Sequence, residues 1–397
     1  MENESGHTAF QSFSPFGGQG ASGIYIHIPF CRQACHYCDF HFSTSMKKRD
    51  EMVLALAKEI TVRREEFKNE TVETIYFGGG TPSVLSNEEI QFLIDAVYQN
   101  YTVGSNPEIT LEANPDDLSA ERIIQLSQSP VNRLSIGVQS FFEEDLKMMN
   151  RAHNALQAEV SIAEAVKHFD NISIDLIYGI PGMGNERWIE NVEKALSFGI
   201  PHISSYALTV EPKTALHTLV KKGIISAPSD EAAQEQFQIL VDILEANGFV
   251  HYELSNFGKE GYFSRNNTAY WLGKKYIGVG PSAHSYDGMH RSWNVANNTL
   301  YLKSMEDGKL PSETEKLSIA DRYNEYIMTG LRTIWGVSLE RVETEIGSIY
   351  KHHLEKEAAK FIEQGLLSND NGILKATKSG KFLADGIASD LFFLNLD

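Results

Sequence analysis

Short apolar runs alternate with longer amphipathic segments over the first 250 residues. Six runs have the length and composition of buried strands, at residues 24–28, 74–77, 108–115, 133–140, 173–182 and 202–210. Between them, apolar residues recur at helical spacing at about 46–67, 87–100, from 119, and at 143–149, 154–168, 188–199 and 237–248. Ser86 and Glu89 form a capping box for the second of these helices. This alternation predicts a parallel sheet with right-handed crossovers.

The number of strands limits the architecture. Six β/α units are too few for a closed eightfold barrel, so the sequence predicts an α/β fold built as an open, three-quarter parallel β/α barrel. A doubly wound sheet made from the same alternation is the structural alternative.

The C-terminal part of the chain has a different pattern. Helical periods cover about 317–334, 338–346 and 351–364, and two short strands follow around Asn371-Gly372, a favoured hairpin turn. We therefore expect a small α+β domain resembling a winged helix. The predicted organisation is a flexible extension or cloning remnant at 1–22, the partial-barrel core at 23–250, a connecting region at 251–311 and the winged-helix-like domain at 312–397.

Composition and charge narrow the functional classes. The chain has 397 residues, a formal net charge of −18 and 42% hydrophobic residues, which is an ordinary globular composition. The acidic balance argues against a general nucleic-acid binder, and residues 312–397 contain 14 acidic against 10 basic residues. No apolar run of 18 residues is present and the N-terminus lacks the pattern of a secretory signal, so a cytoplasmic location is expected. Nothing indicates peripheral membrane contact, and the sequence sets no oligomeric state.

All three cysteines lie in one short segment directly after the first apolar run. Cys31, Cys35 and Cys38 form a C-x3-C-x2-C array. Three thiolates on one loop can ligate three irons of a [4Fe-4S] cluster and leave the fourth iron without a protein ligand. A zinc site completed by His27, His36 or His41 and a set of inert thiols are the alternatives. Three unpaired thiols in so long a chain also suggest a reducing compartment.

Further polar motifs collect at the carboxyl ends of the predicted strands, where parallel α/β folds bind their ligands. A glycine run by itself is more typical of a tight turn, but it also lets a ligand approach the backbone. Buried charges at such positions need a partner or a ligand. The motifs are Gly78–Thr81 after the second strand, Glu112 and Asn114 at the end of the third, Gln139 and Ser140 after the fourth, Asp175 in the fifth and Tyr206 in the sixth.

The cluster loop and its surroundings carry a family resemblance. The segment YIHIPFCxxxCxYCDF, together with GGGTP, LEANP, GVQS and YGIPG, resembles the HemN/HemW family of radical S-adenosylmethionine (radical SAM) proteins. That family contains oxygen-independent coproporphyrinogen III dehydrogenases and haem chaperones. The resemblance covers nearly the whole chain from residue 23 and implies a partial-barrel core with a HemN-type C-terminal domain.

The resemblance also implies cofactors and the residues that hold them. SAM chelates the open iron, and reduction of the cluster cleaves SAM to a 5′-deoxyadenosyl radical. Some members bind a second SAM. Tyr37 is expected beside the adenine. The positions that match the family's SAM-binding residues are Tyr25, Gly79, Gly80, Thr81, Glu112, Gln139, Arg151 and Asp175.

Two departures from the family pattern bear on function. Phe40 stands where the dehydrogenase branch has a fourth cysteine, which favours the haem-chaperone branch. Asn266 stands where that branch has the histidine of H-N-x-x-Y-W, and a carboxamide is not a standard haem ligand.

Other residues are candidates for the haem site. His251 or His284 would have to ligate the iron. Tyr270, Trp271 and Tyr276 could form an aromatic wall for a flat macrocycle, although plain packing is an equal interpretation.

The expected function is therefore that of a haem chaperone, which binds a [4Fe-4S] cluster, SAM and haem or porphyrin and delivers haem to acceptor haemoproteins. The alternative is oxidative decarboxylation of coproporphyrinogen III. No catalytic residue is assigned, so enzymatic turnover stays open beside the chaperone role. A zinc-bound structural or nucleic-acid module is disfavoured by the ligand count and the net charge.

Overall fold

Six parallel strands form the core of the protein and follow one another in sequence order. The computed structural model describes residues 21–394. The strands are β1 (Ala21–Ile28), β2 (Thr71–Gly79), β3 (Val103–Ala113), β4 (Arg133–Gln139), β5 (Asn171–Tyr178) and β6 (His202–Ala207). Each pairs in parallel with the next. This confirms the partial β/α barrel, and the sequential order excludes the doubly wound alternative, whose order reverses at a switch point.

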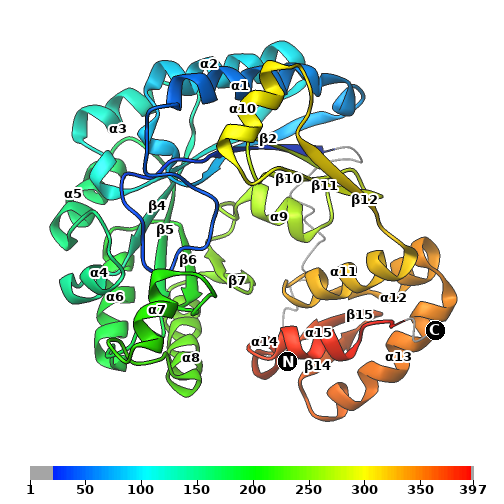
Figure 1. Ribbon diagram of the computed structural model, residues 1–397. Helices are drawn as coiled ribbons and strands as arrows, with labels where there is room; N and C mark the ends of the chain where they lie inside the picture. Colours follow the sequence, from blue (N-terminus) through cyan, green and yellow to red (C-terminus); the bar gives the residue numbers. More distant parts are fainter. Residues whose placement is uncertain (1–20, 395–397) are drawn as a thin grey trace, which may run out of the picture.

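Helices cover the outer face of this sheet (Figure 1). They are α1 (Arg49–Val62), α2 (Asn87–Asn100), α3 (Ala120–Ser127), α4 (Glu143–Met148), α5 (Ala155–Ala165), α6 (Asn185–Ser197), α7 (Ala215–Lys221) and α8 (Asp230–Ala246), with 3-10 turns η1 (Arg64–Phe67), η2 (Pro82–Val84) and η3 (Pro115–Asp117). The predicted capping box is present, because Ser86 Oγ accepts from the Glu89 amide and the Glu89 carboxylate accepts from the Ser86 amide. The apolar faces of these helices and the strand side chains beneath them make one continuous core.

The expected boundary at residue 22 is wrong by two residues. Strand β1 begins at Ala21, and Ser22 is buried with its hydroxyl donating to the Thr71 carbonyl at 3.2 Å. The small polar composition of this stretch concealed the start of the strand. The rest of the predicted extension, residues 1–20, lies outside the described residues.

Residues 250–316 extend the sheet at both of its edges, which the sequence did not indicate. Strands β7 (Val250–Glu253) and β8 (Asn256–Gly258) join the edge at β6, whereas β9 (Tyr276–Val279), β10 (His284–Tyr286), β11 (His290–Asn294) and β12 (Ser312–Lys316) join the edge at β1. Helices α9 (Arg265–Trp271) and α10 (Asn298–Glu306) lie between these strands in sequence. The strands are short, and β12 is exposed along its whole length, so apolar alternation is missing. We call β9–β12 the extension sheet.

The C-terminal domain has its own small core below the barrel (Figure 1). It contains α11 (Ile319–Leu331), α12 (Leu339–Arg341), the π-helix η4 (Val342–Ile346), α13 (Ser348–Glu363), α14 (Lys378–Lys381) and α15 (Ala384–Asp390) around a sheet of β13 (Val337–Ser338), β14 (Leu367–Asp370) and β15 (Ile373–Ala376). The hairpin turn is as predicted, because Asn371 and Gly372 both have positive φ. The helix expected at 338–346 is instead divided into β13, α12 and η4.

Within 21–394, none of the helices combines the length and the hydropathy needed to cross a bilayer.

Candidate functional site

The cleft at the carboxyl ends of β1–β6 brings together nearly all the residues selected from the sequence. It has a volume of about 410 Å³. Of the twelve predicted residues, eleven line it: Cys31, Cys35, Tyr37, Cys38, Gly79, Gly80, Thr81, Glu112, Gln139, Arg151 and Asp175. The twelfth, Tyr25, lies within the sheet and stacks on Tyr76 with ring centroids 6.0 Å apart. We call this the cluster cleft.

The sulfur atoms of the cysteine loop receive hydrogen bonds from the surrounding strands. The Thr81 hydroxyl donates to Cys31 Sγ and Arg151 Nη1 donates to Cys35 Sγ, both at 3.3 Å. Burial raises the pKa of Cys31 and of Cys38 to about 11. Donors aimed at sulfur favour the thiolate form against the cost of burial. Three cysteine sulfurs lining one cleft are the type of donor that a [4Fe-4S] cluster with one open iron requires, but no group of three Cys, His, Asp or Glu side chains within residues 21–394 is arranged to hold a metal ion.

The glycine run positions the cysteine loop. The Gly80 amide donates to the Ile28 carbonyl at 2.9 Å and the Thr81 amide donates to the Phe30 carbonyl at 2.7 Å. A Cβ on residue 80 would lie 2.6 Å from the Phe30 carbonyl oxygen, so a larger side chain would push the loop away from β2. Because these two amides donate to carbonyls of the chain itself, they are not available to a ligand. The glycines allow the cysteine loop to approach β2 closely.

Arg151 connects the loop to the rim of the barrel. Its Nη2 donates to Asn114 Oδ1 and to the Gly137 carbonyl, both at 2.7 Å, and its Nη1 faces Cys35 Sγ and the Tyr37 hydroxyl. Burial opposes the positive charge, but Tyr37 and Cys35 outweigh it and raise the pKa of Arg151. The guanidinium is a fixed positive charge beside the thiols.

Two half-buried carboxyl groups lie in the floor of the cleft. Glu112 accepts from the Tyr76 hydroxyl at 2.7 Å, and burial raises the pKa of Glu112 to about 7. Asp175 accepts from the Ser135 hydroxyl at 3.3 Å, and burial raises the pKa of Asp175 to about 6. Neither carboxylate has an ion-pair partner among residues 21–394. Both are available to a cationic ligand such as the amino group of SAM.

Sequence reasoning missed two residues that complete this floor. Tyr76 donates to Glu112 and Ser135 donates to Asp175. The signal was the period of two along buried strands, because Ser135 has the same parity as Gly137 of the GVQS motif, and Tyr76 the same parity as Gly78.

Comparisons with known proteins agree with this geometry. The model of the Radical SAM superfamily matches residues 25–214, and that of the HemN C-terminal domain matches residues 317–383. A protein of Bacillus subtilis (strain 168) named Heme chaperone HemW is 35% identical to this chain, over 91% of this chain and 97% of that protein. This chain belongs to the HemN/HemW family of the radical SAM superfamily.

Other relatives extend over similar lengths. Heme chaperone HemW of Mycobacterium tuberculosis (strain ATCC 25618 / H37Rv) is 33% identical over 95% of this chain and 96% of that protein. The mitochondrial Radical S-adenosyl methionine domain-containing protein 1 of Bos taurus is 31% identical over 95% and 89%. Among solved structures, coproporphyrinogen III oxidase (HemN) from Escherichia coli covers 94% of this chain and 90% of that chain with a TM-score of 0.82 and 22% identity, which describes the HemN/HemW fold.

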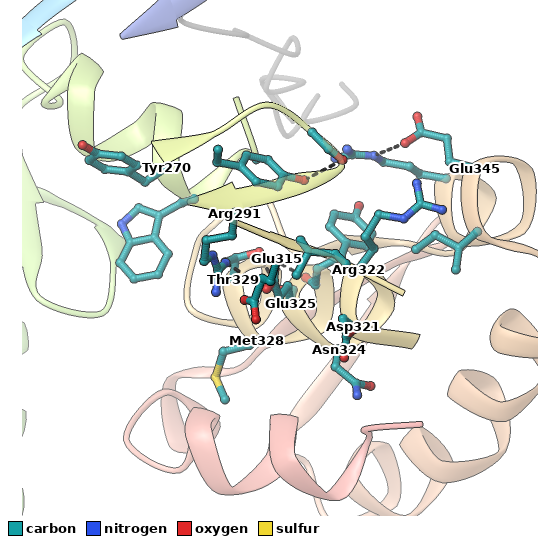
Figure 2. A pocket seen from close by; sticks show the side chains of 18 of the residues that line it. Tyr270, Arg291, Glu315, Asp321, Arg322, Asn324, Glu325, Met328, Thr329 and Glu345 are labelled. Carbon is teal, nitrogen blue, oxygen red and sulfur yellow. Dashed lines mark hydrogen bonds and ion pairs between the residues drawn. The ribbon is translucent and has the colours of Figure 1, made fainter. Parts of the chain in front are cut away.

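The aromatic residues expected to face a macrocycle lie in a second cleft (Figure 2). Tyr270, Trp271 and Tyr276 line a space of about 720 Å³ between the extension sheet and α11 of the C-terminal domain. Tyr270 packs edge-on against Tyr276 with ring centroids 4.5 Å apart. We call this the interdomain cleft.

The two histidines considered as haem ligands differ in availability. The His251 ring is buried, with Nε2 3.1 Å from the Leu254 carbonyl and Nδ1 3.0 Å from Lys381 Nζ, so both nitrogens are engaged. His284 is exposed, and its ring has no hydrogen-bond partner within residues 21–394. Burial lowers the pKa of His284, which keeps the imidazole neutral. His284 lines a further cleft of about 730 Å³ together with Trp293.

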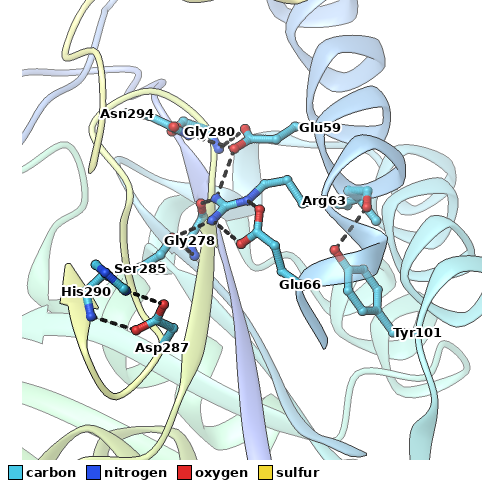
Figure 3. Close-up of polar contacts among 11 residues, drawn as sticks. Glu59, Arg63, Glu66, Tyr101, Gly278, Gly280, Ser285, Asp287, His290 and Asn294 are labelled. Carbon is cyan, nitrogen blue, oxygen red and sulfur yellow. Dashed lines mark hydrogen bonds and ion pairs between the residues drawn. The ribbon is translucent and has the colours of Figure 1, made fainter. Parts of the chain in front are cut away.

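A buried polar network fixes which way these strands face (Figure 3). The Asn294 side chain donates to Glu59 Oε1 at 2.8 Å, and Arg63 Nη2 donates to the Ser285 hydroxyl at 3.1 Å. Because Ser285 and Asn294 contact α1 and its end, their neighbours His284 and Tyr286 point to the opposite face of the extension sheet. His284 therefore shares a sheet face with the interdomain cleft, about 7 Å along the strand from Tyr286.

Asn266 lies at the other end of the barrel from the cluster cleft. Its side-chain carbonyl accepts from the Thr74 hydroxyl at 3.2 Å, and its backbone N–H donates to Glu108 Oε1 at 3.1 Å. Thr74 precedes Gly79 by five residues, about 16 Å along β2. The Asn266 side chain is buried in this contact and does not line the interdomain cleft.

Proposed function

We propose that this protein is a haem chaperone that binds a [4Fe-4S] cluster and SAM and delivers haem to acceptor haemoproteins. The observation that carries the proposal is the 35% identity to a protein named Heme chaperone HemW over 91% of this chain and 97% of that relative. The free thiols and the cofactor suit a reducing cytoplasm.

The cluster cleft supports the cofactor part of the proposal. Cys31, Cys35 and Cys38 would ligate three irons, and when bound the cluster and SAM supply one-electron reductive cleavage chemistry. Arg151 would hold the loop and its thiolates in place, and the carboxylates of Glu112 and Asp175 would attract the positive charges of SAM. Tyr37 borders the same space and offers a flat face for the adenine.

The accessible imidazole on the extension sheet supports the haem part. With Asn266 in place of the family histidine and both nitrogens of His251 engaged, His284 is the candidate iron ligand. We expect His284→Ala to remove the ligand-dependent shift of the haem Soret band, whereas His352→Ala, at an exposed position on α13, leaves the spectrum unchanged. An unchanged spectrum in His284→Ala would assign the ligand elsewhere.

The second candidate function is oxidative decarboxylation of coproporphyrinogen III. It is favoured by the fold shared with E. coli HemN at a TM-score of 0.82. Phe40 opposes it, since this residue lines the cluster cleft where the dehydrogenase branch has a cysteine.

One anaerobic experiment separates the two functions. The reconstituted protein is given SAM and a reductant, then either coproporphyrinogen III or haem followed by an apo-haemoprotein. Haem transfer without protoporphyrinogen supports the chaperone. Formation of protoporphyrinogen would contradict it.

A further inference from the structure

The interdomain cleft has one wall from the barrel side and one from the C-terminal domain. Tyr276 and Tyr286 belong to adjacent strands of the extension sheet, and Met328 lies opposite on α11 (Figure 2). The volume of about 720 Å³ lies in the range of pockets that enclose a small molecule or cofactor. Partly exposed aromatic rings in such a space suit a flat, apolar ligand.

Four of the eight charged side chains that line the cleft pair with one another, and Glu315 and Lys316 form no ion pair within residues 21–394. Arg291 on β11 pairs with Glu325 on α11 at 2.8 Å across the cleft. Arg341 pairs with Glu345 at 2.9 Å and lies over the Tyr326 ring at 4.6 Å. The first pair joins the two walls, the second lies within the C-terminal domain, and each pair neutralises its own charges.

Arg322 is different. It lies in the first half of α11 and lines the cleft, yet its guanidinium has no hydrogen bond or ion pair within residues 21–394. Its neighbour Asp321 does not neutralise it by direct contact, because the Asp321 carboxylate accepts from the Ser318 amide at 2.9 Å as part of a capping box. Burial raises the pKa of Tyr286, and the charge of Arg322 acts against that rise, which places the guanidinium near the aromatic wall.

A half-buried arginine fork with no partner in the described part of the chain, beside aromatic rings, matches a flat ligand with carboxylates at one edge. A porphyrin with two propionates has this chemistry. Building on the haem chaperone proposed above, we infer that the interdomain cleft binds the propionate edge of the porphyrin and that Arg322 is its carboxylate contact.

The test uses metal-free protoporphyrin IX, so that binding does not depend on an iron ligand. Fluorescence titration of the full chain should give a Kd about tenfold or more weaker for Arg322→Gln than for wild type, since a charge-assisted hydrogen bond is lost. Arg322→Lys should fall between them, because it keeps the charge without the planar fork. Arg64→Gln is the matched control and should bind as wild type, since Arg64 is exposed on η1 and, within residues 21–394, pairs only with Glu65. Equal melting temperatures of the variants exclude misfolding.

The dimethyl ester of protoporphyrin IX checks the chemistry of the contact. The ester has no carboxylate, so wild type and Arg322→Gln should bind it equally and weakly. If wild type binds protoporphyrin and Arg322→Gln binds it just as tightly, the inference is overturned while haem handling stands. If wild type binds neither haem nor protoporphyrin, both the inference and the proposed function are overturned.

Discussion

The cluster cleft and the interdomain cleft are built in opposite ways. The first is lined by residues at the ends of consecutive parallel strands and by one loop between them. The second is lined by residues 270–346 and Phe392, from a small helix, four short strands and a separately packed domain. The residues of the cluster cleft can be predicted from the sequence, because a parallel sheet brings the carboxyl ends of its strands together at one edge. The second exists only because two cores dock against each other.

Several contacts join the C-terminal domain to the barrel side. Lys378 of α14 pairs with Asp242 of α8 at 2.7 Å, and Lys381 Nζ lies 3.0 Å from His251 Nδ1. Arg332, which pairs with Asp385 inside its own domain, lies over the Trp271 ring at 5.6 Å. The cluster cleft, by contrast, is supported by a continuous parallel sheet. A substitution in the cluster cleft should therefore change how the cofactor is held. A substitution in the interdomain cleft should change the affinity for the ligand.

The largest effect is expected from the cysteine loop. Cys35→Ala should remove one of three cluster ligands and abolish cluster assembly, measured as iron content and visible absorbance after anaerobic reconstitution. Gln33→Ala in the same loop, whose amide donates to the Asn150 carbonyl, should keep its iron. Full iron content in Cys35→Ala would refute the ligand assignment.

The next effect concerns Arg151, the half-buried cation beside the thiols. Arg151→Met should weaken SAM binding to the reconstituted protein about tenfold or more, because the loop loses its contact with the strand rim. Arg122→Met is the control, since Arg122 contacts Asn87 and the Leu85 carbonyl outside the cleft. Both variants should lose stability, but only Arg151→Met should lose SAM. Equal SAM affinities would contradict the assignment.

Titration of Glu112 in the floor of the cluster cleft should make the stability of the protein depend on pH. Glu112 has a folded pKa of about 7, above the unfolded value of about 4.3, so it binds more protons when folded. The stability that its protonated form supplies is present below about pH 4 and is lost as the pH rises to about 7. The unfolding free energy of Glu112→Gln relative to that of wild type should therefore rise by up to about 3 kcal/mol between pH 4 and pH 8. Denaturant unfolding at pH 4 and pH 8 measures the difference in unfolding free energy between wild type and Glu112→Gln, with Glu88→Gln at an exposed position as the control. A difference that is the same at both pH values would disprove the prediction.

The smallest effect is expected where the family motif is broken. Asn266→His should leave haem affinity within about threefold, because residue 266 faces Thr74 and lies outside the interdomain cleft. The larger ring should cost about 1–3 kcal/mol of unfolding free energy by overpacking. Haem titration and thermal unfolding test both parts. A tenfold gain in haem affinity would show that position 266 reaches the macrocycle.

The sequence by itself determined the barrel and its ligand rim. Apolar runs alternating with helical segments predicted six parallel strands, and the positions of Glu112, Gln139 and Asp175 in or near the ends of these strands predicted that they share one rim. The three cysteines needed only local spacing. Polar residues at strand ends meet in space whatever the rest of the chain does, because parallel strands share one carboxyl edge.

Only the tertiary structure decided the second cleft and the choice among histidines. Strands of three to five residues, such as β8 and β12, carry too few side chains for a readable period, and their pairing depends on the sheet edges that they join. His251 and His284 look alike in sequence, yet one is enclosed by Lys381 and the other is open. Long-range docking sets burial and partners, and no local pattern records which surface a residue will meet.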